Sequence, residues 1–490
     1  MSGEQQQRDL RVVVLGAGMA GILSAIKLRE EGYRNIVVYE KGDSVGGTWR
    51  DNHYPGLTCD TPSHNYTYSF APNPEWSRFL SPGIEIRDYF ERVVDDFGIR
   101  DLIRLKHEIT ACEYVEGRWV LEIKGGKQDT ADIVIAATGV LHHPSYPKIN
   151  GMDRFEGRLM HTSRWDDEVA LDGKRIGVIG NGSTGVQMVS ALAGRAEKLK
   201  HFQRSAQWIM PVENPDFTEE QKAEFRANPQ LLHDLKYDET YMALVKRFTT
   251  AAADPDSTEM HEIEDIVRKN LEESVTDPEL REKLRPTYRA ACKRLIYSPN
   301  YYQAIQHPNA ELVTEGIECI EPEGIRTRDG KLHELDVIGL ATGFNAHMFM
   351  RPMKVKGRHG ADLEELWAKR PKAYLAITMP DFPNFFMLNG PTGPVGNFSL
   401  IEITEFQWDY VSQLMGLLRD GSYREICVSR EAMDAYEERR IAKAKTTIFG
   451  SGCNSWYLDA EGVPSTWPWD YAAFEKAMET PDLEAYELVK

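Results

Sequence analysis

A glycine-rich loop occurs twice in this chain, each time between a short apolar run and a stretch with helical spacing. An apolar run without alternation, such as RVVVL at 11–15 or RIGVI at 175–179, is typical of a parallel strand buried on both faces. Glycines at this spacing allow a tight turn and let a pyrophosphate approach backbone N–H groups at a helix N-terminus. We therefore predict an α/β protein with two Rossmann-like dinucleotide-binding domains. The two loops are Gly16-x-Gly18-x-x-Gly21 and Gly180-x-Gly182-x-x-Gly185.

The two copies differ at one position beyond the loop. Glu40 ends the next predicted strand, 36–39, where a carboxylate can accept hydrogen bonds from two ribose hydroxyls. Arg204 stands at the same offset from Gly180 as Glu40 does from Gly16. A carboxylate repels a 2′-phosphate, whereas a guanidinium binds one through two parallel hydrogen bonds. We therefore expect FAD at the first site and NADPH at the second, with a solvated surface arginine as the alternative for Arg204.

The charge balance of the chain favours a small-molecule substrate. Its 490 residues include 58 Lys and Arg against 76 Asp and Glu, and the net charge of −18 would repel nucleic acid and anionic membranes. The longest apolar stretch begins at Val12 and is interrupted by glycines, so neither a membrane span nor a signal peptide is expected. We predict a soluble cytoplasmic protein without nucleic-acid or membrane partners, and its oligomeric state stays open.

The cysteines are scattered, without a Cys-x-x-Cys pair or the Cys/His spacing of a zinc site, so no metal site is expected. Free thiols in a reducing compartment are the prediction. Flavin disulfide reductases use the same pair of dinucleotide sites but need a redox-active cysteine pair close in sequence. Electrons that pass from NADPH to a flavin are therefore expected to go to dioxygen. The six residues are Cys59, Cys112, Cys292, Cys319, Cys427 and Cys453.

Further segments indicate how the chain is organised. DIVIAATG at 132–139 and DVIGLATG at 336–343 share an acidic residue, an apolar run and Ala-Thr-Gly. Each is predicted to close a dinucleotide-binding sheet where the chain crosses between domains. Glu/Lys/Leu-rich segments at 211–293 have helical periodicity broken by Asn-Pro and Asp-Pro pairs, which predicts a helical insertion beside the second sheet. Another helical pattern runs over 399–418.

Two longer motifs lie outside the glycine loops. The stretch Phe155-x-Gly157-x-x-x-His161-Thr162-x-x-Trp165-Asp166 resembles the FxGxxxHxxxW(P/D) fingerprint of type I Baeyer–Villiger monooxygenases at every fixed position. The stretch Gly46-Gly47-x-Trp49-x-x-x-x-Tyr54-Pro55-Gly56-x-x-x-Asp60 is similar to a second signature of that family. Related flavin monooxygenases that act on nitrogen and sulfur usually lack the tryptophan at the position of Trp165. The Baeyer–Villiger subgroup is therefore favoured, and the resemblance extends to the Ser455-Trp456-Tyr457 segment.

The resemblance implies an FAD-binding domain built from residues 1–150 and 381–490, and an NADP-binding domain of residues 151–380 that includes the insertion. It implies that NADPH reduces the flavin, that dioxygen adds at C4a, and that the peroxyflavin attacks a ketone to give an ester or lactone. Two alternatives stay open: a flavin monooxygenase that oxygenates nitrogen or sulfur, and an NADPH oxidase or redox-sensing flavoprotein. The identity of the ketone does not follow from the sequence.

The resemblance also implies roles for single residues. Arg294, followed by the Tyr301-Tyr302 pair, matches the catalytic arginine of the family, whose fixed charge would stabilise a developing negative oxygen. Asp60 matches the acid that orients this arginine. His161 is assigned to the hinge between domains because the chemistry needs no protonated imidazole at the peroxide.

The other matched residues are expected to contact cofactors. Lys293 would join Arg204 and Ser205 at the 2′-phosphate, with a solvated lysine as the alternative. Trp456 matches a tryptophan that lies over the nicotinamide, and Trp49 is either a flavin contact or core packing. Four apolar residues are expected to fill the core, and the ketone pocket is the second interpretation. They are Met350, Met387, Leu388 and Phe398. The predicted cofactor-binding residues are Gly16, Gly18, Gly21, Glu40, Gly47, Thr48, Trp49, Asp60, Tyr66, Gly180, Gly182, Ser183, Thr184, Gly185, Arg204, Ser205, Lys293 and Trp456.

Overall fold

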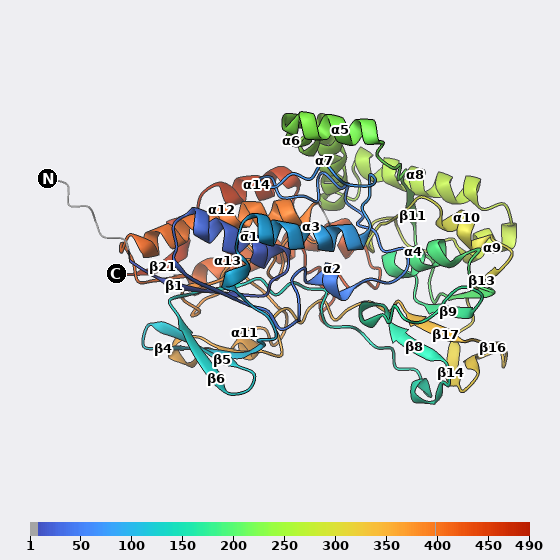
Figure 1. The fold of residues 1–490 in the computed structure, drawn as a ribbon, viewed down its shortest axis with the longest axis horizontal. Helices are drawn as coiled ribbons and strands as arrows, with labels where there is room; N and C mark the ends of the chain where they lie inside the picture. Colours follow the sequence, from blue (N-terminus) through green and yellow to red (C-terminus); the bar gives the residue numbers. More distant parts are fainter. Residues whose placement is uncertain (1–7, 397) are drawn as a thin grey trace.

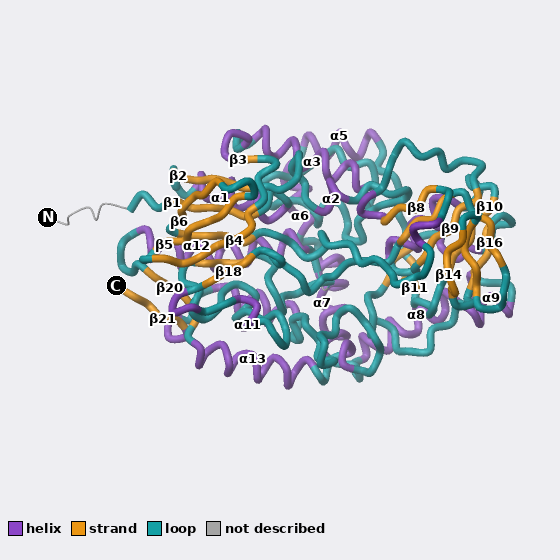
Figure 2. The backbone as a smooth tube through the Cα atoms, turned by 90° about the horizontal axis from the view of Figure 1, so that it is seen from below, coloured by secondary structure: helices purple, strands orange, loops and turns teal. Residues whose placement is uncertain are grey.

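Two five-stranded parallel sheets lie at opposite ends of an elongated molecule, with helices and long loops between them (Figures 1 and 2). This computed structural model describes residues 8–396 and 398–490. Across the first sheet the order is β19 (Phe385–Met387), β7 (Ile133–Ala136), β1 (Arg11–Leu15), β2 (Asn35–Tyr39) and β3 (Ile103–Arg104). Across the second it is β13 (Ala310–Val313), β10 (Lys198–Phe202), β9 (Arg175–Ile179), β17 (Val337–Leu340) and β8 (Arg158–His161). The predicted α/β class is confirmed.

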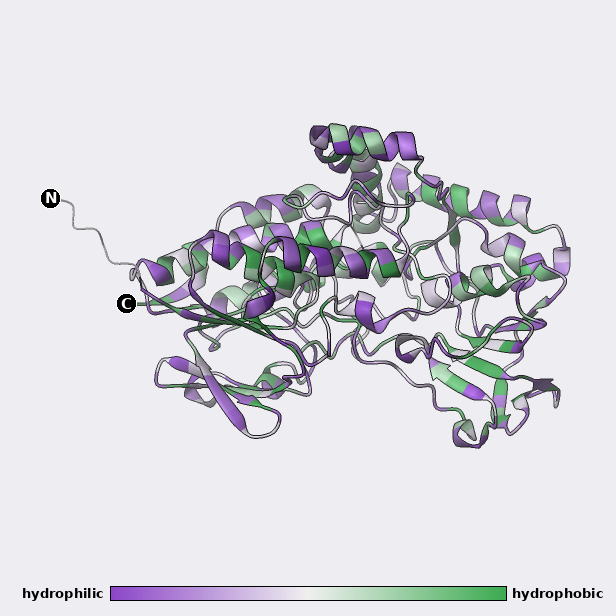
Figure 3. Ribbon diagram, viewed as in Figure 1, coloured by the Kyte–Doolittle hydropathy of each residue, from purple (hydrophilic) through white to green (hydrophobic). Residues whose placement is uncertain are grey.

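The two sheets repeat one arrangement around each glycine loop. β1 pairs in parallel with β2 and β7, and β9 pairs in the same way with β10 and β17. Most residues of these strands are buried, as a sheet covered on both faces requires. The strands at the right of Figure 3 are accordingly largely hydrophobic, whereas helix α5 (Glu219–Ala227) is mostly hydrophilic. Dinucleotides bind at the carboxyl edge of such a sheet, where the strand order reverses.

Both Ala-Thr-Gly segments follow interior strands of the sheets. β7 and β17 were expected to close the two sheets, but β19 adds beyond β7 and β8 adds beyond β17. The first glycine of each loop has a positive φ, +104° at Gly16 and +107° at Gly180. A Cβ on Gly16 would overlap the carbonyl oxygen of Ala137, and a Cβ on Gly180 would overlap that of Ala341. Glycine is therefore required where the loop passes the neighbouring strand end.

The helices of the first sheet come from both ends of the chain. α1 packs against α12, and α12 packs against α14, around one continuous apolar core. The sequence pattern places α12 at 399–418, one residue from its observed bounds. The main helices here are α1 (Met19–Glu30), α3 (Gly83–Asp96), α12 (Leu400–Arg419), α13 (Arg430–Ala444) and α14 (Tyr471–Glu479). The second loop leads into α4 (Ser183–Leu192).

Short strands and helices complete the described chain. A mixed four-stranded sheet contains β18 (Lys354–Lys356), β4 (Ile109–Val115), β5 (Arg118–Ile123) and β6 (Lys127–Ala131), and a three-stranded sheet contains β14 (Ile317–Glu321), β15 (Gly324–Thr327) and β16 (Leu332–Glu334). Two pairs are β11 (Ile209–Pro211) with β12 (Ile296–Ser298), and β20 (Glu425–Val428) with β21 (Tyr486–Val489). Three short helices are α2 (Thr48–Asp51), α10 (Tyr301–Ile305) and α11 (Leu363–Leu366). No helix in 8–396 or 398–490 has the length and apolarity needed to cross a membrane.

The molecule has a first half built around the first sheet and a second half built around the second sheet. The predicted helical insertion is present, but it lies against both halves (Figure 1). α8 packs beside β11 near the second sheet, as predicted, whereas α7 packs on α14 of the first. The apolar face of α7 carries Ala251 and Ala252, which join Ile448 and Phe449 in one buried cluster. The insertion was predicted beside the second sheet only. α7 packs on the first half instead because its apolar face is buried against apolar residues of the C-terminal segment. The helices are α5, α6 (Pro229–Lys236), α7 (Glu239–Ala253), α8 (Thr258–Ser274) and α9 (Pro278–Lys283).

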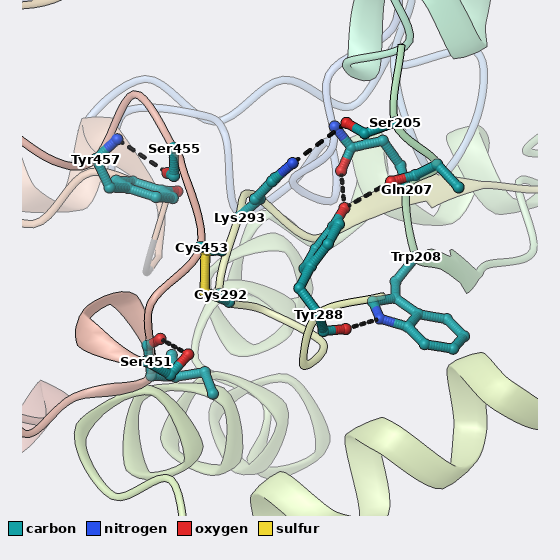
Figure 4. Close-up of a disulfide and its surroundings, with 12 residues drawn as sticks. Ser205, Gln207, Trp208, Tyr288, Cys292, Lys293, Ser451, Cys453, Ser455 and Tyr457 are labelled. Carbon is teal, nitrogen blue, oxygen red and sulfur yellow. Dashed lines mark hydrogen bonds between the residues drawn. A yellow bond between two sulfur atoms is a disulfide. The ribbon is translucent and has the colours of Figure 1, made fainter. Parts of the chain in front are cut away.

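The prediction that every cysteine is a free thiol is wrong at two positions. Cys292 and Cys453, 161 residues apart, form a disulfide (Figure 4). The packing of the insertion against the C-terminal segment brings both cysteines into the same apolar cluster. Sequence spacing could not reveal a pairing that depends on this tertiary contact. Cys59, Cys112, Cys319 and Cys427 are free.

Candidate active site

One cavity of about 1330 Å³ extends from the first glycine loop to the second. Single-ligand pockets usually measure about 300–1000 Å³, so this volume suits more than one bound molecule. Gly21 and Gly185 do not line the cavity; a Cβ on either would overlap the carbonyl oxygen of the first glycine in its own loop. The predicted residues that line the cavity are Gly16, Gly18, Glu40, Gly47, Thr48, Trp49, Asp60, Tyr66, Gly180, Gly182, Ser183, Thr184, Arg204, Ser205, Lys293, Arg294 and Trp456.

The carboxylate of Glu40 is buried and held from several sides. Its Oε2 accepts a hydrogen bond from the N–H of Ala17 at 2.8 Å, and its Oε1 accepts from the N–H of Gly42 at 2.6 Å. Arg50 donates to Oε1 at 2.9 Å. A carboxylate has about four acceptor positions, so capacity remains for ribose hydroxyls. The residues present therefore fit the ribose of FAD.

Aromatic residues line the cavity beside the first loop. The indole N–H of Trp49 donates to the hydroxyl of Tyr66 at 3.0 Å, and the two rings meet edge to face with centroids 5.5 Å apart. Thr48 begins α2, and Gly47 approaches the backbone of Gly18 so closely that a Cβ would lie 3.0 Å from its Cα. Trp49 and Tyr66 thus line the cavity on one side and pack against the core of the first sheet on the other.

Positive charge gathers at the second site. Lys293 donates to the hydroxyl of Ser205 at 3.3 Å, and its ammonium lies 4.3 Å from the ring centroid of Tyr288 (Figure 4). Burial and the neighbouring charge of Arg204 lower the pKa of Lys293. The fold therefore brings together the three residues that the sequence assigned to a 2′-phosphate. Arg204 and Lys293 repel each other when no ligand is bound, and an anion bound between them would relieve this repulsion.

Arg294 forms the link between the two sites. Its Nη2 donates to Oδ2 of Asp60 at 2.5 Å, and both side chains line the cavity. Arg294 precedes β12 in the second half of the molecule, whereas Asp60 comes after α2 in the first. Burial opposes the charge of Arg294, but Asp60 and Tyr457 outweigh it and raise the pKa of the guanidinium. The cation therefore persists throughout the working pH range.

The C-terminal segment supplies another wall. Trp456 lines the cavity, is 39% exposed, and stacks on Tyr457 with ring centroids 4.2 Å apart. The carbonyl of Trp456 accepts a hydrogen bond from Nε2 of His347 at 2.9 Å, in the tautomer that protonates this nitrogen. Of the four apolar residues expected first in the core, Met350, Leu388 and Phe398 are buried and also line the cavity, whereas Met387 lies in the core alone.

His161 does not line the cavity. Its Nδ1 accepts from the N–H of Ser163 at 3.1 Å, and its Nε2 lies 3.1 Å from the carbonyl oxygen of Gly343. Gly343 ends the Ala-Thr-Gly segment after β17. Burial lowers the pKa of His161, so the ring is neutral at neutral pH. These contacts tie β8 to β17, and they agree with a structural position rather than an acid–base one.

Some residues of the cavity were not singled out by any motif. Arg50 occupies a variable position directly after Trp49 in the second signature. This position beside a matched residue was the sequence signal that could have pointed to a place in the cavity. Asn389 lines the cavity with its side-chain oxygen buried and unpartnered within the described residues, as expected of a group that faces a ligand. Arg328 and Gln207 reach the cavity from loops that the sequence could not place.

Comparison with known proteins identifies the family. The pyridine nucleotide-disulphide oxidoreductase family matches residues 13–228. An uncharacterized monooxygenase of Mycobacterium tuberculosis is 44% identical over 97% of this chain and 96% of its own length. A Baeyer–Villiger monooxygenase of Streptomyces coelicolor is 36% identical over 99% of this chain and 94% of its own length. The chain belongs to the Baeyer–Villiger monooxygenases.

Solved structures agree with this assignment. A crystal structure of OTEMO in complex with FAD and NADP covers 99% of this chain and 100% of its own length, with 27% identity and a TM-score of 0.88. The present chain is thus an FAD- and NADP-dependent Baeyer–Villiger monooxygenase. The relation to disulphide oxidoreductases lies in the nucleotide-binding fold, because neither Cys292 nor Cys453 lines the cavity.

Proposed function

We propose that this Baeyer–Villiger monooxygenase converts a ketone to an ester or lactone with NADPH and dioxygen. The observation that carries the proposal is the Arg294–Asp60 pair, which lines the cavity between the two glycine loops. A bound FAD, reduced by NADPH, supplies the activation of dioxygen. The relative from Streptomyces coelicolor bears the name of this reaction, which supports the ketone as substrate class.

Arg294 is the proposed catalytic cation. Insertion of oxygen beside a carbonyl develops negative charge on oxygen, and a guanidinium within the cavity stabilises that charge. Asp60 orients the planar group through Nη2, and the guanidinium as a whole lines the cavity in which the reacting atoms would lie. Because the pKa of Arg294 is raised, the guanidinium keeps its proton and stays positively charged.

The remaining residues bind and orient. Glu40 would hold the ribose of FAD, and Trp49 with Tyr66 would bound the flavin on one side. Arg204, Ser205 and Lys293 would bind the 2′-phosphate of NADPH. Trp456 would cover the nicotinamide and exclude water from it, as its place at the cavity rim allows. Met350, Leu388 and Phe398 present apolar surface on which a ketone can rest.

A ketone panel tests the proposal. Purified holoenzyme is supplied with NADPH, dioxygen and linear, cyclic, aromatic or steroidal ketones, and products are identified by mass spectrometry. The expected result is an ester or lactone one oxygen atom heavier than its ketone, formed with NADPH consumption that rises when the ketone is added. Consumption of NADPH that yields only hydrogen peroxide with every ketone, or oxygenation of thioethers alone, would contradict it.

A further inference from the structure

We propose that Tyr457 is a positioning residue that holds the Arg294 guanidinium in place, and that the Cys292–Cys453 disulfide anchors it. The inference rests on the proposed role of Arg294 as the catalytic cation. None of the sequence motifs assigns a role to Tyr457 or to either cysteine. The three residues lie in one buried cluster directly beside Arg294.

The guanidinium has two polar neighbours, Asp60 at Nη2 and Tyr457 near Nη1. Asp60 accepts a hydrogen bond from Nη2. Nη1 and the hydroxyl of Tyr457 converge on the backbone of Gly396, where a Cβ would overlap both atoms. Gly396 has a φ of +79°, a conformation that side chains rarely adopt, so glycine leaves room for this convergence. Arg294 is therefore bounded on its Nη1 side by Tyr457 and on its Nη2 side by Asp60.

The charge state of Tyr457 suits this place. Its side chain is 2% exposed. Burial raises the pKa of its hydroxyl, although Arg294 partly offsets the shift, so the hydroxyl stays neutral near neutral pH. A neutral oxygen can accept a hydrogen bond from the cation without cancelling its charge. Asp60 forms an ion pair with Arg294, whereas the neutral Tyr457 brings no charge and does not weaken the field of the cation.

The disulfide holds the segment that carries Tyr457. Figure 4 shows it joining the chain next to Lys293 to the segment with Ser455 and Tyr457. The hydroxyl of Ser455 accepts from the N–H of Tyr457 at 3.0 Å. The carbonyl of Tyr457 accepts from the N–H of Ser465 at 2.7 Å. Arg294 and Tyr457 are thus linked covalently through residues close to each of them.

The same segment presents Trp456 to the cavity. Because Trp456 stacks on Tyr457, a shift of one ring displaces the other. The position of the cation is therefore coupled to the proposed nicotinamide cover. Neighbouring residues of one segment thus position the cation and cover the nicotinamide. The disulfide at Cys453 would hold both side chains in place together.

Tyr457→Phe tests the proposal, with Tyr436→Phe as control. The hydroxyl of Tyr436 is also buried, in the core of the first half, and has no partner within the described residues. In the Tyr457→Phe holoenzyme, FAD content and the KM for NADPH should stay unchanged. The share of consumed NADPH recovered as ester should fall about tenfold, with hydrogen peroxide as the balance, because the cation loses a hydrogen-bond partner.

The midpoint potential of FAD provides a second measurement. A guanidinium near the flavin stabilises its reduced anion, so displacement of Arg294 should shift the potential to a more negative value. Wild-type coupling and an unchanged potential in Tyr457→Phe would overturn the inference. If no ketone is oxygenated by the wild type, the proposed function fails, but the potential still decides the role of Tyr457.

The anchor is tested by a double-mutant cycle. Cys292→Ser combined with Cys453→Ser should lower coupling about threefold in the wild-type background and leave Tyr457→Phe without further change, because the disulfide acts through Tyr457. Equal losses in both backgrounds would show that the disulfide contributes to stability alone, and would overturn the anchoring role.

Discussion

The two dinucleotide loops have the same backbone arrangement but differ in the charged residue beyond the next strand. Glu40 is buried and receives hydrogen bonds from Ala17, Gly42 and Arg50. Arg204 is exposed and lies close enough to Lys293 to lower the pKa of that lysine, which in turn donates to Ser205. A buried carboxylate held by several hydrogen bonds suits a cofactor that stays bound, whereas an exposed arginine beside a half-buried lysine suits a cosubstrate that leaves in each turnover. We therefore propose that the two similar loops serve two different cofactors because of the residues that lie beyond them.

Reversing the charge of Arg204 at the second site should have the largest effect of the variants that test this comparison, and the effect should be on the use of NADPH. Arg204→Glu places the first site's residue type in the second, where it would repel the 2′-phosphate. We expect kcat/KM for NADPH to fall on the order of a hundredfold or more, because a charge-assisted contact is replaced by repulsion. Kinetics with NADH should change by less than about threefold.

Arg195→Glu is the matched control for that variant. Arg195 is an exposed arginine of the same half, paired with Asp172 and outside the cavity. Its reversal should leave the kinetics with both nucleotides unchanged. An equal loss with NADPH and NADH in Arg204→Glu would refute the assignment of the 2′-phosphate.

Glu40→Gln should weaken the first site by a smaller factor. The amide keeps the shape but lacks the charge that attracts Arg50 and the N–H donors, so the dissociation constant of FAD should rise about tenfold. Equilibrium dialysis of the apoenzyme with FAD measures this change. Glu30→Gln, on the outer face of α1, is the control and should bind FAD normally. Unchanged FAD affinity in Glu40→Gln would show that the carboxylate does not hold the ribose.

The smallest effect concerns pH. Burial and Arg204 lower the pKa of Lys293, so its charge is present below that pKa and is lost as the pH rises through it. The KM for NADPH should therefore increase at a pH below the usual range of lysine. In Arg204→Ala the repulsion is removed, and the increase should move to higher pH. Steady-state kinetics across alkaline pH measures the shift, and an identical pH profile in both proteins would contradict the coupling.

The sequence predicted features that depend on neighbours along the chain. The strand, loop and helix of each half result from local patterns, and Glu40 and Arg204 stand at fixed offsets within them. The Arg294–Asp60 pair came from matched motifs, because no local pattern joins two residues in different halves. The structure then brought the pair together at 2.5 Å.

Features that depend on packing between distant segments were beyond sequence reasoning. The Cys292–Cys453 disulfide exists because α7 and α8 pack against the C-terminal segment. The same packing brings Tyr457 to Arg294. Asn389 and Arg328 reach the cavity on loops whose paths have no periodic signal. Each of these contacts joins parts of the chain that only the folded structure places together.

The measurement closest to the central claim is product formation by Arg294→Ala holoenzyme. A fixed cation at the reacting oxygen contributes about a hundredfold to a thousandfold in rate. The variant should retain FAD and oxidise NADPH, yet form ester at least about a hundredfold more slowly and release hydrogen peroxide instead. Ester formation at the wild-type rate would contradict the claim that Arg294 supplies the essential positive charge.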